Sequence, residues 1–100
     1  MLDRLAKIEE RYQELNEQMA TPEIASDLKR LQVLAQERTS LEDLVTRYRE
    51  YKAAAKSLEE VKAMRLEGLD EEMDELAKQE VESLEAQLDH LLQELKLALL

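Results

Sequence analysis

EGLDEE, residues 67–72, contains the only glycine of the chain and lies between two long stretches of regularly spaced apolar residues. Gly68 accepts a left-handed backbone conformation that Leu or Glu resists, so a helix can end there. Asp70 is a favourable N-cap, and Glu71 and Glu72 place negative charge where the dipole of a following helix favours it. The stretch therefore predicts a tight turn between two helices.

A heptad pattern follows this turn and predicts a helix over about residues 70–100. Alternating steps of three and four place its apolar residues on one helical face, and Leu92 and Leu99 widen that face toward the C-terminus. The members of this third seam are Ala77, Val81, Leu84, Leu88, Leu91, Leu95 and Ala98.

A longer pattern precedes the turn and predicts a helix that ends near residue 66. It begins at residue 22 or 26, because Thr21 with Pro22, or Ser26, can start it. Val33 and Val45 lie off the pattern, and we expect both in the core beside Leu41 and Leu44. The seam consists of Ile24, Leu28, Leu31, Leu34, Leu41, Leu44, Tyr48, Tyr51, Ala55 and Leu58.

The N-terminal stretch has a third pattern, which predicts a helix over about residues 2–20. Because both connections are short, consecutive helices should be antiparallel neighbours. We therefore expect an all-α fold: an elongated, antiparallel, coiled-coil-like three-helix bundle with one long central helix flanked by two shorter ones. It forms a single domain over residues 1–100, and its first seam is Leu5, Ile8, Tyr12, Leu15 and Met19.

Composition limits the classes of function. The chain is 38% charged and has a net charge of −10, with no Cys and no apolar run of the ~20 residues that span a bilayer. We expect a soluble cytoplasmic protein without a disulfide framework or a membrane partner. Residues 67–100 carry two basic and eleven acidic groups, so this segment should repel nucleic acid.

Catalytic and metal sites are not predicted. The chain has one His, and no nucleophile–base pair or ligand set is recognisable, so we expect no enzyme activity and no cofactor. His90 with Glu94 is half a metal site at best, and a solvent-facing His beside a helical Glu explains the pair. The acidic run at residues 70–75 lacks the ligand spacing of a calcium loop.

Two groups of residues are candidates for contact with a partner. Arg49, Lys52 and Lys56 recur at helical spacing within the basic run 47–65, and could meet rRNA or an acidic protein. The alternative is that this run pairs with the acidic third helix.

Leu97 and Leu100 form the second group, because they lie outside the third seam in a C-terminus that has no Gly or Pro to stop the helix. We expect the chain to be the N-terminal fragment of a larger protein. Other domains, or a second copy of the fragment, would then cover these two leucines.

The order of several segments resembles a known family. MLDRLAKIEERYQEL (1–15), TPEI (21–24), REYKAAAKSLEEVKAM (49–64), DEEMDELAKQE (70–80) and ELKLALL (94–100) resemble the N-terminal helical domain of bacterial class I peptide chain release factors. The closer resemblance is to the release factor one type, which reads UAA and UAG. One departure is LDEEM (69–73), where relatives often have Asp-Pro-Glu-Met.

The resemblance implies a non-catalytic arm that assists docking on the ribosome during translation termination. Stop-codon reading and peptidyl-tRNA hydrolysis would belong to domains outside these residues. It also implies three partners: the stalk base of the large ribosomal subunit, the release-factor glutamine methyltransferase, and the factor's own central domains. A stand-alone coiled-coil adaptor or dimerisation protein remains the alternative.

Overall fold

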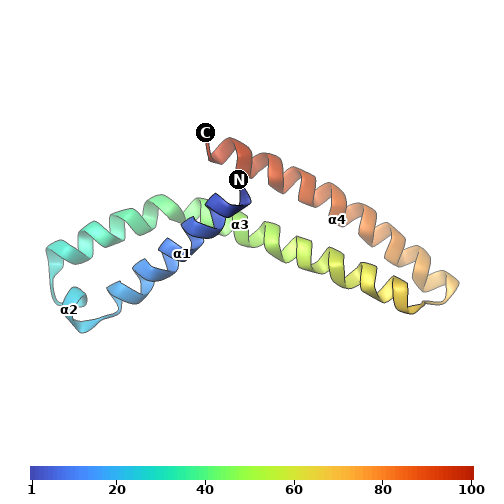
Figure 1. Cartoon of the computed structure of the whole chain (residues 1–100), viewed down its shortest axis with the longest axis horizontal. Coiled ribbons are helices and arrows are strands. Elements are labelled where there is room, and N and C mark those ends of the chain that lie inside the picture. Colours follow the sequence, from blue (N-terminus) through green and yellow to red (C-terminus); the bar gives the residue numbers. More distant parts are fainter. The chain divides into compact units, whose positions relative to one another are not determined.

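A computed structural model describes all of residues 1–100 and contains only α-helices (Figure 1). The all-α prediction is confirmed. Two compact units divide the chain, Met1–Thr46 and Arg47–Leu100, and the longest helix contributes to both. None of the helices combines the length and apolar character needed to cross a bilayer. The helices are α1 (Leu2–Met19), α2 (Pro22–Ala25), α3 (Leu28–Glu67) and α4 (Glu71–Ala98).

In the first unit, α1 lies antiparallel to the first half of α3. The heptad seam of α1 is its buried face: Leu5, Tyr12 and Leu15 are buried, and Ile8 and Met19 are half-buried. These residues form one apolar stripe because steps of three and four return to the same side of a helix.

The connection between α1 and α3 is more elaborate than the sequence suggested. Thr21 occupies the N-cap position of the short α2, yet its hydroxyl donates a hydrogen bond back to the Gln18 carbonyl (2.7 Å). The Ser26 hydroxyl donates to the Pro22 carbonyl (2.7 Å), and Asp27 accepts from the Arg30 backbone N–H (3.2 Å). The central helix therefore begins at residue 28, capped by Asp27, and the segment before it forms a separate helical turn.

Two predictions of core residues in the first unit are wrong. Val33 was expected in the core, but it is 64% exposed, whereas Val45 is buried as expected. Leu28 is also exposed, in the first turn of α3. A single neighbouring helix covers only one face of α3, and successive side chains diverge by about 100°. Because Leu34 points toward the neighbouring helix and is half-buried, the adjacent Val33 points toward solvent.

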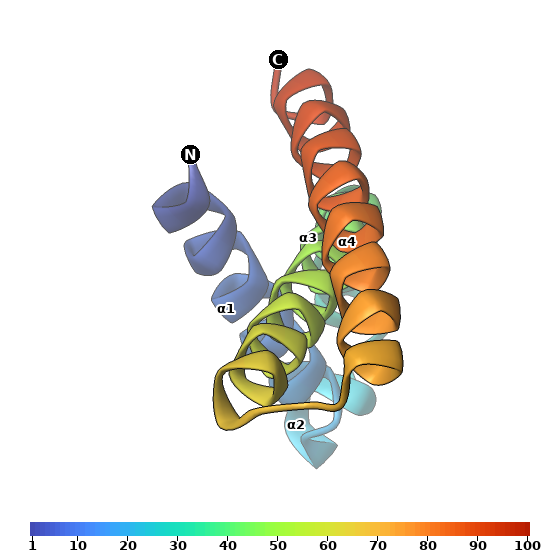
Figure 2. The ribbon, with the colours of Figure 1, turned by 90° about the vertical axis from the view of Figure 1, so that its right-hand side faces the viewer.

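In the second unit, the rest of α3 packs antiparallel to α4, and the two lie side by side in Figures 1 and 2. Gly68 has a φ of +104°, which confirms the predicted left-handed turn. Asp70 accepts a hydrogen bond from the Met73 backbone N–H (2.8 Å), which confirms it as the N-cap of α4. Leu84, Leu91 and Leu95 of the third seam are buried, whereas Ala98, in its last turn, is exposed.

Candidate partner-contact surface

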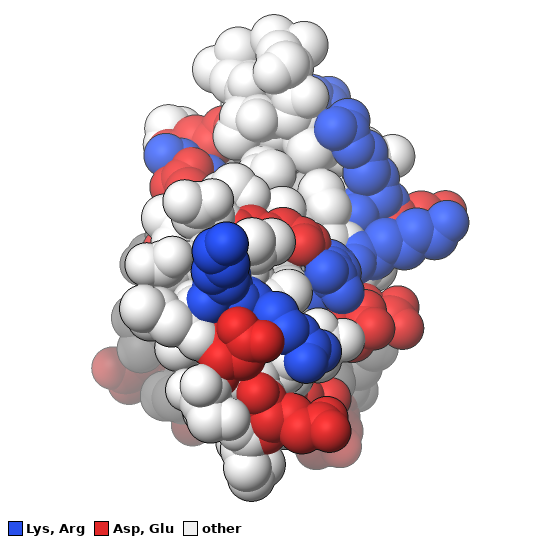
Figure 3. All heavy atoms as spheres, turned by 90° about the vertical axis from the view of Figure 1, so that its left-hand side faces the viewer, with Lys and Arg blue, Asp and Glu red and all other residues white.

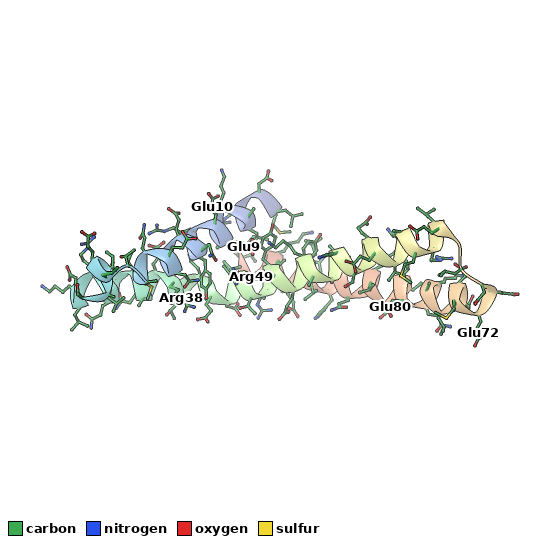
Figure 4. All side chains as sticks on the ribbon, turned by 90° about the horizontal axis from the view of Figure 1, so that it is seen from below. Glu9, Glu10, Arg38, Arg49, Glu72 and Glu80 are labelled. Atoms are coloured by element: carbon green, nitrogen blue, oxygen red, sulfur yellow. The ribbon has the colours of Figure 1, made fainter.

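The predicted basic candidates lie on the second half of α3. Arg49, Lys52 and Lys56 are separated by three and four residues, so they share one side of the helix, and all three are exposed. The Lys52 ammonium lies 4.7 Å from the centroid of the Tyr48 ring, which is within cation–π range. This contact positions the Lys52 charge. Figure 4 labels Arg49. The structure brings these three cations together on one surface.

The alternative, that the basic run pairs with the acidic helix α4, holds for Arg47 and Arg65. Arg47 donates to Glu94 (2.7 Å), and Arg65 donates two hydrogen bonds to Asp74 (3.0 and 3.2 Å). Sequence reasoning did not single out these arginines. One signal was present: Arg65 follows Leu58 by seven residues, so it continues the heptad seam toward the turn.

The contact between Arg65 and Asp74 changes the titration of both groups. The hydrogen bonds from the guanidinium, together with its charge, hold the pKa of Asp74 below its ordinary value. The same hydrogen bonds raise the pKa of Arg65. This pair is therefore ionised at neutral pH and joins α3 to α4 beside the turn.

The aromatic and imidazole side chains take structural positions in this unit. Tyr48 is buried and Tyr51 is half-buried, as their seam positions predicted, which favours a packing role over stacking on a base. His90 is exposed, and its Nε2 lies 2.7 Å from Glu94 Oε1. No group of three or more His, Cys, Asp or Glu side chains could hold a metal ion.

The predicted apolar candidates lie at the end of α4. Leu97 is 71% exposed and Leu100 is fully exposed. Both lie off the buried seam, as the heptad pattern indicated, because Leu95 occupies the core position in this turn. Two large aliphatic side chains are thus open to a partner.

A polar cluster in the first unit was not predicted. Arg11 donates two hydrogen bonds to Glu37 (2.6 and 2.8 Å), which lower the pKa of Glu37 and raise that of Arg11. Arg38 donates to Asn16 and lies 4.9 Å from the Tyr12 ring centroid. Figure 4 labels Arg38 on α3, and Figure 3 shows acidic and basic side chains interspersed on one face. These contacts join α1 to α3.

Comparison with known families gives a direct match. Residues 8–100 match the model of the PCRF domain. The chain belongs to the PCRF domain family. This match covers both units, from the middle of α1 to the end of the sequence.

Relatives of this PCRF-domain chain share sequence along its whole length. It is 43% identical over 100 residues to peptide chain release factor 1 of Geobacillus sp. (strain WCH70) and of Brevibacillus brevis. It is 40% identical to the same factor of Bacillus subtilis (strain 168). Each match covers 100% of this chain and 28% of the relative, at its N-terminal end. No solved structure matches the chain.

Proposed function

We propose that residues 1–100 act as the non-catalytic helical arm of a peptide chain release factor, in cytoplasmic translation termination at UAA and UAG codons. The proposal rests on the match of the whole chain to the first 28% of release factor 1 from several bacteria. In this proposal the arm assists docking on the ribosome. Stop-codon reading and peptidyl-tRNA hydrolysis are assigned to regions outside these residues.

The chemistry of the described residues supports a non-catalytic role. The single His is exposed and contacts Glu94, and the chain contains no Cys. General acid–base and nucleophilic catalysis both require a reactive group held beside a second group that activates it. The arrangement of polar groups instead favours a function in binding.

The basic side of α3 supports a contact with ribosomal RNA. Arg49, Lys52 and Lys56 place three cations along one side of a helix, and Lys or Arg side chains that neutralise phosphates release bound counterions. We assign this side of α3 to the stalk base of the large subunit.

Two further contacts belong to the same proposal. The exposed Leu97 and Leu100 would pack against the central domains of the factor, since burying large aliphatic side chains stabilises a domain interface. The release-factor glutamine methyltransferase would also contact this arm during modification of the factor.

A chimeric factor tests the proposed function. This chain replaces the matching 100 residues of Bacillus subtilis release factor 1, and a deletion variant of the same factor lacks the segment. We expect the chimera to bind ribosomes and release peptide at UAA and UAG at close to the parental rate, and the deletion variant to bind more weakly. Equal binding and release by the deletion variant would contradict docking, and inactivity of a folded chimera would favour the coiled-coil adaptor.

The basic side is tested in the same chimera by Arg49→Ala/Lys52→Ala/Lys56→Ala. Losing three phosphate contacts should reduce the slope of log K against log salt concentration by about 2, at ~0.7 per contact. The control, Lys7→Ala/Lys78→Ala/Lys96→Ala, removes the same charge from other exposed positions. Equal effects of the two triple variants would refute a specific contact on α3.

A further inference from the structure

The turn end of the α3–α4 hairpin carries three large apolar side chains that stay open to solvent. Met64 of α3 is 49% exposed, and Met73 and Leu76 of α4 are 47% and 54% exposed. Single exposed apolar residues are ordinary, whereas a contiguous exposed apolar patch is a candidate for a binding surface. The question is therefore whether the three side chains lie together on one side of the hairpin.

The ion pair beside the turn places the three residues on one side of the hairpin. Arg65 contacts Asp74, and Met64 and Met73 each directly precede one member of that pair. In two antiparallel right-handed helices, one step backward along each chain turns both side chains toward the same flank. Leu76 lies three residues after Met73 and therefore beside it on α4. We call Met64, Met73 and Leu76 the hairpin patch.

Acidic side chains surround the hairpin patch. Glu60 and Glu67 lie four residues before and three residues after Met64, which makes them its neighbours on α3. Glu72 and Glu80 lie four residues before and after Leu76 on α4, and all four glutamates are exposed. Figure 4 labels Glu72 and Glu80 on α4.

The same neighbouring positions contain no cation. No residue three or four positions from Met64, Met73 or Leu76 is Lys or Arg. The surface is thus apolar at its centre and negative at its rim. Its complement has apolar side chains flanked by positive charge.

We propose that the hairpin patch binds a basic amphipathic helix of a partner protein. The apolar face of that helix would lie on Met64, Met73 and Leu76, and its Lys or Arg side chains would reach the four glutamates. Methionine suits this use, because its unbranched thioether adapts to different apolar partners. The three apolar residues lie nearer the turn than the basic side of α3, which the rim adjoins only where Glu60 follows Lys56 by four residues, and the inference does not depend on the proposed function.

Charge disfavours two other occupants. Nucleic acid would bring phosphates against the rim, where attraction to cations is the usual source of affinity. A second copy of the chain, packed patch to patch, would bring four glutamates against four. A cationic protein segment avoids both repulsions.

Binding of a designed peptide to the 100-residue chain provides the first test. The probe is an 18-residue, fluorescein-labelled amphipathic helix of Leu and Lys, titrated by fluorescence anisotropy. Leu76→Ser should weaken binding about fivefold or more, in proportion to the apolar area withdrawn from the contact. Leu66→Ser is the matched control, since Leu66 is exposed but directly follows Arg65, on the other flank. It should leave affinity within about twofold.

A second pair of variants tests whether the peptide contacts the glutamates of the rim or is attracted only by the overall negative charge of the chain. Glu72→Gln/Glu80→Gln should weaken the Leu–Lys peptide about tenfold, at roughly 0.7 kcal/mol for each lost charge contact. Glu82→Gln/Glu85→Gln removes the same charge from exposed positions of α4 away from the patch, and should change affinity less than threefold. Circular dichroism confirms that each variant remains helical.

Several outcomes would overturn the proposal. They are equal losses in the two glutamine double variants, equal losses in the two serine variants, or absence of peptide binding. Equal affinity for a Leu–Glu peptide of the same pattern would also contradict it. Binding of single-stranded RNA, or dimerisation in sedimentation, that Leu76→Ser abolishes would assign the patch to that other occupant.

Discussion

The two units both pair α3 with a neighbouring helix, but they distribute their polar contacts differently. In the first unit the contacts of Arg11 with Glu37, and of Arg38 with Asn16 and Tyr12, gather within about two turns of α1. In the second unit the ion pairs of Arg65 with Asp74 and of Arg47 with Glu94 stand between about five and six turns apart along α4, the first of them beside the turn.

The connections between the paired helices also differ between the two units. Gly68 and Asp70 turn the chain directly from α3 into α4, so the pairing register of the second unit is set at the turn. The first unit interposes α2 and a second cap, and a longer connection permits more than one register. In the second unit the turn and the ion pairs both constrain the pairing of α3 with α4, whereas in the first unit the polar contacts of Arg11 and Arg38 constrain the pairing of α1 with α3 without such a direct turn.

The largest expected effects come from the apolar seams, which the two units share. Leu15 is completely buried and Leu84 is buried in the other unit. Leu15→Ala and Leu84→Ala should each cost about 2–5 kcal/mol, since truncation removes apolar burial and leaves a cavity. Urea unfolding measures the loss, and hydrogen exchange locates it. Exchange that accelerates equally throughout the chain in both variants would mean that the units unfold as one.

The turn of the second unit comes next. No atom lies within 4 Å of a Cβ added at Gly68, so Gly68→Ala should cost about 1–3 kcal/mol through its positive φ alone. Ala20, the C-cap of α1, has a φ of −83°, and Ala20→Gly should change stability by less than about 1 kcal/mol. Thermal unfolding compares them. If both variants had equal cost, the turn would not be the decisive element of the second unit.

The two Asp caps give a smaller and more closely matched contrast. Asp70 accepts a 2.8 Å hydrogen bond at the start of α4, and Asp27 accepts a 3.2 Å bond at the start of α3. Asp70→Ala should cost about 1 kcal/mol and Asp27→Ala less, because the shorter bond satisfies its N–H better. Guanidinium titration of both variants tests this order. A larger loss for Asp27→Ala would reverse it.

The smallest expected effects are those of pH on the ion pairs. Hydrogen bonds from arginine lower the folded-state pKa of Glu37 in one unit and of Asp74 in the other. Each carboxylate therefore stabilises the fold at neutral pH, and this contribution is lost as the pH falls through the folded-state pKa, which lies below the ordinary value of the group. Melting temperatures of Glu37→Gln and Asp74→Asn should approach that of the parent chain in acid. A constant difference from pH 7 to pH 2 would contradict the linkage.

Periodicity and special residues were enough to predict most of the fold. Heptad spacing identified Leu15, Leu84 and Leu91 as core residues, and the only glycine marked the turn that has a positive φ. Such signals are local, because helix geometry and backbone sterics act within a few residues. For the same reason the sequence could place Arg49, Lys52 and Lys56 on one side of a helix.

Only the tertiary structure decided which side chains meet and which stay open. Val33 could have been core, but a single neighbouring helix leaves it exposed. Arg65 donates a hydrogen bond to Asp74 across the turn, and this pairing places Met64 and Met73 on the same flank of the hairpin. These outcomes depend on the register and rotation of two packed helices. The spacing within one helix predicts which side is buried, but the register and rotation are set only by the contact with the partner helix.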